Sequence, residues 1–290
     1  MGKSMAHLAH LRVYPVKGLD GIALSEAAVL DGGTLAHDRE FALFDDDGRV
    51  VNGKRAEQIY ELSTEFDPET SVLTVTTREG VTARFDLTSE GEQASEWFGE
   101  YFDESLVLDR DEELGFVDRR KMGPSVVSTA TLRSIASWFD ELSVEGVRRR
   151  LRANVEIGGV PPFWEDQFVG DTGRGFVAGD VRFEGLKPCG RCVVPQRDPD
   201  TGEPFPEFRT RFIEKRRETF PDWADAGAFD HHYAVMILTH IPEQDRGKTL
   251  TVGDEIRTVG EDYTADGSDS TSTDSKKARS WTRESGSNSG

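Results

Sequence analysis

Residues 189–203 read CGRCVVPQRDPDTGE, and this stretch carries the most specific chemical signal of the chain. Cys189 and Cys192 are the only two cysteines, too few for a disulfide scaffold, so metal, redox or catalytic use is favoured. They follow a strand-like segment and a Lys187-Pro188 break, which predicts a loop at a strand end. The arginine between them favours a thiolate by charge pairing, and the thiolate is the form that ligates metals.

Four interpretations of this cysteine pair stay open on the residues alone. A thioredoxin-like dithiol would open a helix in a βαβ unit, but no helical pattern follows the pair. A structural zinc site needs four ligands and would have to recruit two of His231, His232 and His240. The thiols can also pack as small hydrophobic groups. In the fourth interpretation, one cysteine is a soft ligand to a redox metal whose other ligands come from a cofactor.

The hydrophobic pattern of the first 110 residues predicts mainly strands and turns. Strand-like or turn-bounded patterning covers the segments 8–18, 25–30, 39–51, 60–66 and 71–87. An Asp-Gly pair within 45–51 is typical of a tight hairpin. We therefore expect an antiparallel sheet or a β-barrel-like domain in this part of the chain.

Helices are expected in four places, while strands dominate the rest of the second half. The helical patterns cover 89–102, which Ser89 can cap, 128–142, a segment from 143 to near Asn154, and 206–220. Strand patterns cover 175–186, 231–241 and 249–259. Over 261–290 Ser, Gly, Asp and Thr replace core residues, which predicts a disordered, acidic, Ser-rich tail. The fold class is therefore mainly β with some α.

Composition limits the classes of partner. The 290 residues include 54 Asp and Glu and 35 Lys and Arg, and the net charge of −19 is spread along the chain. Such a surface argues against nucleic acid or anionic membrane as partner and resembles that of halophile-like, salt-adapted proteins. We find no run of about 18 apolar residues and no apolar core of a signal peptide, so we expect a cytoplasmic protein.

A phosphate-bearing cofactor in an acidic protein needs a local basic pocket that is rich in hydrogen-bond donors. The sequence offers a Lys-Gly pair at a strand end, isolated arginines, a basic island, and the start of an apolar helix, where free amides can bind phosphate. These candidates are Lys17, Gly18, Arg39, Ser128, Thr129, Arg148, Arg149, Arg150, Arg152 and Asn154. Each motif alone has a plain alternative as a turn, a solvated charge or an N-cap, and only the combination favours a site.

In these motifs the sequence resembles the MOSC superfamily, in particular its members with an N-terminal β-barrel domain, which include amidoxime-reducing proteins. The likeness covers about residues 7 to 260. It rests on YPVKG at 14–18, HDREF at 37–41, STATL at 128–132, RLRANVEIGG at 150–159, PFWEDQFVGD at 162–171 and CGRCVVPQRDPDTGE at 189–203.

The resemblance implies an N-terminal MOSC-associated β-barrel domain over 7–120 and a MOSC β-barrel domain over 121–260. It also implies a molybdenum-pterin cofactor with Cys192 as metal ligand and Cys189 nearby. The residues that match cofactor contacts are Lys17, Arg39, Thr129, Arg152 and Asn154. Family members often have Ser at the position of Gly18, so a backbone amide is expected to replace that hydroxyl.

The activity that this resemblance implies is reduction of N-hydroxylated or N-oxide small molecules by oxygen-atom transfer. Asp198 and Asp200 lie close in sequence to Cys192 and are candidates for a proton relay, although a turn role suits them equally. The four further cysteines of a fused ferredoxin domain are absent, so we expect a separate electron-donor protein of ferredoxin or cytochrome type. The alternatives are a carrier that delivers the cofactor without turnover and a zinc-stabilised binding module.

Overall fold

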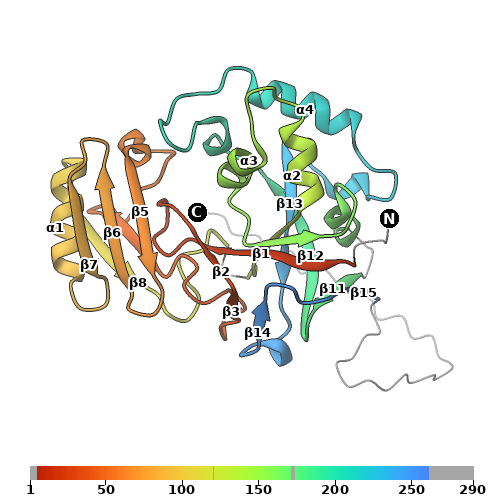
Figure 1. Ribbon diagram of the computed structural model, residues 1–290, viewed down its shortest axis with the longest axis horizontal. Helices are drawn as coiled ribbons and strands as arrows, with labels where there is room; N and C mark the ends of the chain where they lie inside the picture. The colour runs from red at the N-terminus through yellow and green to blue at the C-terminus, as the bar shows by residue number, and fades with distance from the viewer. Residues whose placement is uncertain (1–4, 120, 171–173, 261–290) are drawn as a thin grey trace, which may run out of the picture.

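The computed structural model describes residues 5–119, 121–170 and 174–260, and its largest element is an eight-stranded sheet (Figure 1). The strand order in this sheet is β15-β11-β12-β13-β9-β10-β1-β2. The bounds are β1 (His7–Val13), β2 (Ile22–Leu24), β9 (Ser125–Ser128), β10 (Val155–Gly158), β11 (Gly175–Ala178), β12 (Val181–Gly190), β13 (Ala234–His240) and β15 (Ile256–Val259). The prediction of a mainly β protein is confirmed.

The strand pairing does not close this sheet into a complete barrel, which differs from the expectation. β15 and β2 form its two edges in the described residues. A single isolated bridge between His7 and Glu255, with the Leu8 amide donating to the Asp254 carbonyl at 2.8 Å, links β1 to the segment before β15. The sheet therefore curls toward closure without a continuous ladder between its ends.

A second group of elements lies at the other end of the molecule (at the left in Figure 1) and encloses its own hydrophobic core. It contains β4 (Phe41–Asp45), the 3-10 helix η1 (Glu57–Glu61), β5 (Leu62–Asp67), β6 (Val72–Thr77), β7 (Thr82–Asp86), α1 (Gly91–Phe102) and β8 (Leu106–Arg110). α1 buries Ala94, Phe98 and Phe102 because their three- and four-residue spacing places them on one helix face. The expected cap Ser89 is wrong, since its hydroxyl donates to Asp86 and Glu90 takes the cap position.

The remaining helices lie near the large sheet, and the three longest of them contribute to a third apolar core. They are α2 (Thr129–Ala136), α3 (Val144–Leu151), η2 (Trp164–Phe168), η3 (Val194–Gln196), α4 (Phe208–Glu218), η4 (Ala226–Ala228) and η5 (Glu243–Asp245). α2 and α3 begin after Ser128 and Ser143, whose hydroxyls accept amide hydrogen bonds as N-caps. No described helix is long and apolar enough to cross a membrane.

Strands from the two predicted domains pair with each other. β1 comes from the first part of the chain but pairs with β10, and β3 (Glu26–Ala28) pairs with β14 (Thr249–Thr251). These crossings bring the residues after β1 to the sheet that carries the cysteine loop. The boundary between 120 and 121 stays a prediction, and the predicted tail over 261–290 lies outside the described residues.

Candidate functional site

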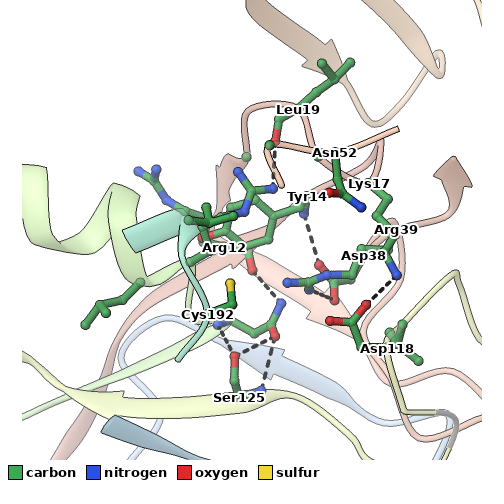
Figure 2. A pocket seen from close by; sticks show the side chains of 18 of the residues that line it. Arg12, Tyr14, Lys17, Leu19, Asp38, Arg39, Asn52, Asp118, Ser125 and Cys192 are labelled. Atoms are coloured by element: carbon green, nitrogen blue, oxygen red, sulfur yellow. Dashed lines mark hydrogen bonds and ion pairs between the residues drawn. The ribbon is translucent and has the colours of Figure 1, made fainter. Parts of the chain in front are cut away.

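A cavity of about 620 Å³ lies where the residues after β1, the end of α3 and the loop after β12 meet (Figure 2). The charge of its lining is opposite to that of the whole chain, because ten lining residues are Lys or Arg and three are Asp. The cations are Arg12, Lys17, Arg39, Lys54, Arg119, Arg149, Arg150, Arg152, Arg191 and Arg197. Such a concentration of guanidinium and ammonium donors favours a polyanionic ligand.

Cys192 lies on the loop after β12, as predicted, and lines this cavity, whereas Cys189 lies within β12 and not on the predicted loop (Figure 2). Two hydrogen bonds tie the loop to the start of β13: the Arg191 amide donates to the Tyr233 carbonyl at 2.9 Å, and the Tyr233 hydroxyl donates to the Cys192 carbonyl at 3.2 Å. Both cysteines are free and half-buried. The Arg191 guanidinium contacts Cys189 Sγ at 3.3 Å, so the expected pairing with an arginine falls on Cys189.

Arg39 and Arg152 both stack on the ring of Tyr14, with guanidinium carbons 4.9 and 4.0 Å from the ring centre. Arg39 also pairs with Asp38, and Arg152 donates to the Leu19 carbonyl at 2.7 Å. Burial raises the pKa of Tyr14 and lowers the pKa of Arg152. Of these two arginines only Arg39 has an ion pair among the described residues, with the buried Asp38, so an anion bound beside the Tyr14 ring would stabilise the charge of Arg152.

Lys17 and Gly18 also line the cavity. The Lys17 ammonium donates to the Phe116 carbonyl at 2.7 Å and to Asp118 at 2.6 Å. Burial would raise the pKa of Asp118, but the hydrogen bond from Lys17 lowers it overall. Gly18 has a φ of +100°, and a Cβ there would lie 2.9 Å from the Ile59 side chain, so the backbone itself requires glycine.

Asn154 forms part of the cavity wall and is buried. Its side-chain oxygen accepts hydrogen bonds from the Ser125 amide at 3.1 Å and the Ser125 hydroxyl at 3.0 Å. Its amide nitrogen donates to the Arg12 carbonyl at 3.2 Å. Asn154 therefore joins the end of β1 to the start of β9.

Ser128 and Thr129 lie away from this cavity lining. The Ser128 hydroxyl caps α2 by accepting from the Thr131 amide at 3.0 Å. The Thr129 hydroxyl donates to the buried carboxylate of Glu156 at 2.7 Å, and Arg148 donates to the same carboxylate at 2.6 Å. The structure thus gives Ser128 the N-cap role that was its plain alternative, and it places Thr129 in an internal network.

Asp198 and Asp200 are likewise not among the lining residues of the cavity. Asp198 accepts from the backbone amides of Asp200 and Thr201, at 3.0 and 3.1 Å, and pairs with Arg150 at 3.1 Å. Asp200 forms a two-point ion pair with Arg149 at 2.9 and 2.6 Å, and this hydrogen bonding lowers its pKa. Both carboxylates hold the turn that follows the cysteine loop.

The other interpretations of the cysteine pair find little support in the geometry. Within residues 5–119, 121–170 and 174–260, no group of three or more His, Cys, Asp or Glu could hold a metal ion by itself. The pair is followed by the three-residue η3 rather than by a long helix, which differs from a thioredoxin-like motif.

Several residues that line the cavity are not predicted as site residues from the sequence. Arg12, Lys54, Tyr60 and Arg197 come from different segments and meet only at the cavity. Arg197 lies inside the quoted motif 189–203, which was the one signal that could have identified it. Arg12 and Tyr60 sit in strand- or turn-like sequence that gives no sign of a ligand site.

Comparison with known proteins adds independent findings. Residues 5–105 match the family model described as the MOSC N-terminal beta barrel domain, and residues 121–257 match the MOSC domain. A molybdenum cofactor sulfurase from Caenorhabditis briggsae is 23% identical over 224 residues, covering 69% of this chain and 30% of that protein. Mitochondrial amidoxime reducing component 2 from Bos taurus is 21% identical over 237 residues, covering 67% of this chain and 67% of that protein.

Proposed function

Because this chain belongs to the MOSC domain family, we propose that its cavity binds a molybdenum-pterin cofactor with the Cys192 thiolate as metal ligand. The observation that carries the proposal is the coincidence of a free thiol and a strongly basic lining in one cavity of an acidic protein. A thiolate suits a soft redox metal, and the cationic wall suits the phosphate of such a cofactor.

The side chains around the cavity fit this group. Arg150 and Arg191 each keep a buried Nε without a hydrogen-bond partner among the described residues, so the lining retains unused donors. Lys17, Arg39 and Arg152 would hold the phosphate, with the Gly18 backbone alongside. Asn154 would support the pterin side of the pocket. Ser128 and Thr129 do not line this cavity, so they would act only indirectly, through α2 and β10, which their hydrogen bonds stabilise.

We further propose that the protein reduces N-hydroxylated or N-oxide small molecules. Support comes from the name of the Bos taurus relative, an amidoxime reducing component that is 21% identical. When bound, the cofactor would supply two-electron oxygen-atom transfer, while the chain supplies the ligand thiolate, the shape and the positive charge. Electrons would come from a separate donor protein of ferredoxin or cytochrome type.

The test is molybdenum content by mass spectrometry after expression with molybdate. We expect about one molybdenum per chain in the wild type, loss of molybdenum in Cys192→Ala, and retention in the matched control Cys189→Ala. Circular dichroism would confirm that both variants keep the fold. Zinc in place of molybdenum, or equal molybdenum in all three proteins, would contradict the ligand role of Cys192.

A cofactor carrier is the second candidate, favoured by the similarity to a molybdenum cofactor sulfurase, of which this chain spans 30%. A carrier would use the same cavity but release its cargo. Incubation of the loaded protein with a cofactor-free molybdoenzyme distinguishes the two. Transfer of molybdenum without amidoxime reduction would support the carrier, and reduction with retained molybdenum would support the reductase.

A further inference from the structure

Tyr14 directly follows β1 and is only 2% exposed in the wall of the cavity (Figure 2). The loop that carries Arg39 holds its backbone: the Tyr14 amide donates to the Asp38 carboxylate at 3.1 Å, and the Arg39 amide donates to the Tyr14 carbonyl at 2.8 Å. A Cβ at Gly21 would lie 2.5 Å from the ring, so the lack of a side chain there leaves the space that the ring fills. The ring therefore has a closely defined place among the lining residues.

Arg39 and Arg152 come from distant segments, yet each has a left-handed backbone with a φ of +57°. Arg152 ends α3 with a backbone conformation that glycine usually supplies at a helix end. This conformation is unfavourable for a residue with a Cβ, and strain of this kind is found where function requires it. Both side chains reach the same ring, with the guanidinium carbons of Arg152 and Arg39 at 4.0 and 4.9 Å from the centre of Tyr14.

The ring of Tyr14 offsets an unfavourable meeting of two like charges. Burial lowers the pKa of Arg152, and the positive charge of Arg39 lowers it further. The face of an aromatic ring attracts cations, so Tyr14 stabilises two guanidinium groups that would otherwise repel each other. Arg39 also has the carboxylate of Asp38, whereas Arg152 forms no ion pair within the described part of the chain and donates to the Leu19 carbonyl at 2.7 Å.

We propose that Tyr14 is a positioning residue, whose ring holds the guanidinium groups of Arg39 and Arg152 together as one receptor for the phosphate of the cofactor. This inference rests on the proposed function, which assigns the phosphate to these arginines and gives Tyr14 no role. The Tyr14 hydroxyl donates to the Ala153 carbonyl at 3.4 Å, a long hydrogen bond, so the aromatic face is the group that acts. Two arginines held in place lose less conformational freedom when they bind a phosphate than two mobile ones.

The experiment compares wild type with Tyr14→Phe and Tyr14→Met in the full chain, produced in a host that makes no pterin cofactor. Phenylalanine keeps the ring and removes the hydroxyl, whereas methionine refills the space with a flexible chain that has no aromatic face. Tyr14→Leu takes the place of Tyr14→Met if denaturation curves show that the methionine variant does not fold. The matched control is Phe98→Met, because Phe98 is completely buried in the core around α1 and does not line the cavity.

Calorimetric titration with inorganic pyrophosphate measures the anion affinity of these proteins. We expect the Kd of Tyr14→Met to be about tenfold higher than that of wild type, while Tyr14→Phe and Phe98→Met stay within about twofold of it. In a chain that also carries Arg39→Gln and Arg152→Gln, Tyr14→Met should leave the residual affinity unchanged, because the ring then has no guanidinium to hold. A ring that only shaped the cavity would weaken binding in that chain as well.

The remaining outcomes separate this inference from the proposed function. Wild-type pyrophosphate affinity in Tyr14→Met, or an equal loss in Tyr14→Phe, would overturn the role of the ring alone. An equal loss in Phe98→Met would overturn it too, since the loss would then follow from reduced stability. A wild type that binds no pyrophosphate would overturn the phosphate role of the two arginines and this inference with it. Absence of molybdenum as well, after expression with the cofactor and molybdate, would overturn the proposed function.

Discussion

Glu165 is completely buried in η2 beside Asp166, whose carboxylate pairs with the buried Arg216. Burial raises the pKa of Glu165 to about 7 from 4.5, and the charge of Asp166 adds to the rise. Thr131 and the Ser128 amide favour the ionised form, but neither forms a well-aligned hydrogen bond to the carboxylate. The folded protein therefore keeps a proton that the unfolded chain has already released near pH 4.5.

The consequence is a loss of stability as pH rises from about 4.5, complete above about 7, because the folded state must ionise a buried acid. At about 1.4 kcal/mol per pKa unit, the wild type loses about 2 to 3 kcal/mol between pH 5 and pH 8 through this group. Glu165→Gln removes the charge with little change of shape. We expect the stability of this variant relative to wild type to rise by about 2 to 3 kcal/mol between those two pH values.

Chemical denaturation at pH 5 and pH 8 measures this quantity for wild type, Glu165→Gln and the exposed control Glu69→Gln. In thermal melts, a difference of this size corresponds to a Tm at pH 8 that is about 5 to 10 °C higher for Glu165→Gln than for wild type. The control should give the same difference from wild type at both pH values. A stability difference for Glu165→Gln that is equal at pH 5 and pH 8 would refute the assignment of a raised pKa to this site.

Two further predictions concern the scaffold of the cavity. Burial alone would raise the pKa of Glu156, but hydrogen bonds from Arg148 and Thr129 lower it overall. Glu156→Gln removes this stabilised charge and should destabilise the fold at pH 7 by about 2 kcal/mol. This loss should shrink as the pH falls below 4.5, the ordinary pKa of the glutamate, and on through the lowered pKa of Glu156 in the folded protein. Denaturation curves that give the same loss at every pH would contradict this prediction. Gly18→Ala should lower stability by about 2 kcal/mol through its positive φ and the contact with Ile59. Gly80→Ala, at a φ of +85° with nothing near its Cβ, isolates the backbone contribution, and equal losses in thermal melts of both variants would exclude the contact.

Local patterns of the sequence anticipate much of the fold. Alternating apolar residues predict strands such as β6, because a half-buried strand needs that period whatever its partners are. Ser128 marks the start of α2, since an N-cap depends only on the next three residues. The failure at Ser89 has an equally local reason, because its hydroxyl donates to Asp86, three residues earlier, in the turn before the helix begins.

The sequence by itself predicted the chemical groups of the candidate site: a free cysteine on a loop after a strand, and basic motifs able to hold an anion. Only the tertiary structure decided which of these meet. The pairing of β1 with β10 places Lys17 in the wall of the cavity that Cys192 also lines, while Asp198, six residues from Cys192, pairs with Arg150 and is not among the lining residues. Helix caps and strand periods depend on neighbouring residues, but a cavity wall depends on pairings between distant strands, which no short stretch of sequence encodes.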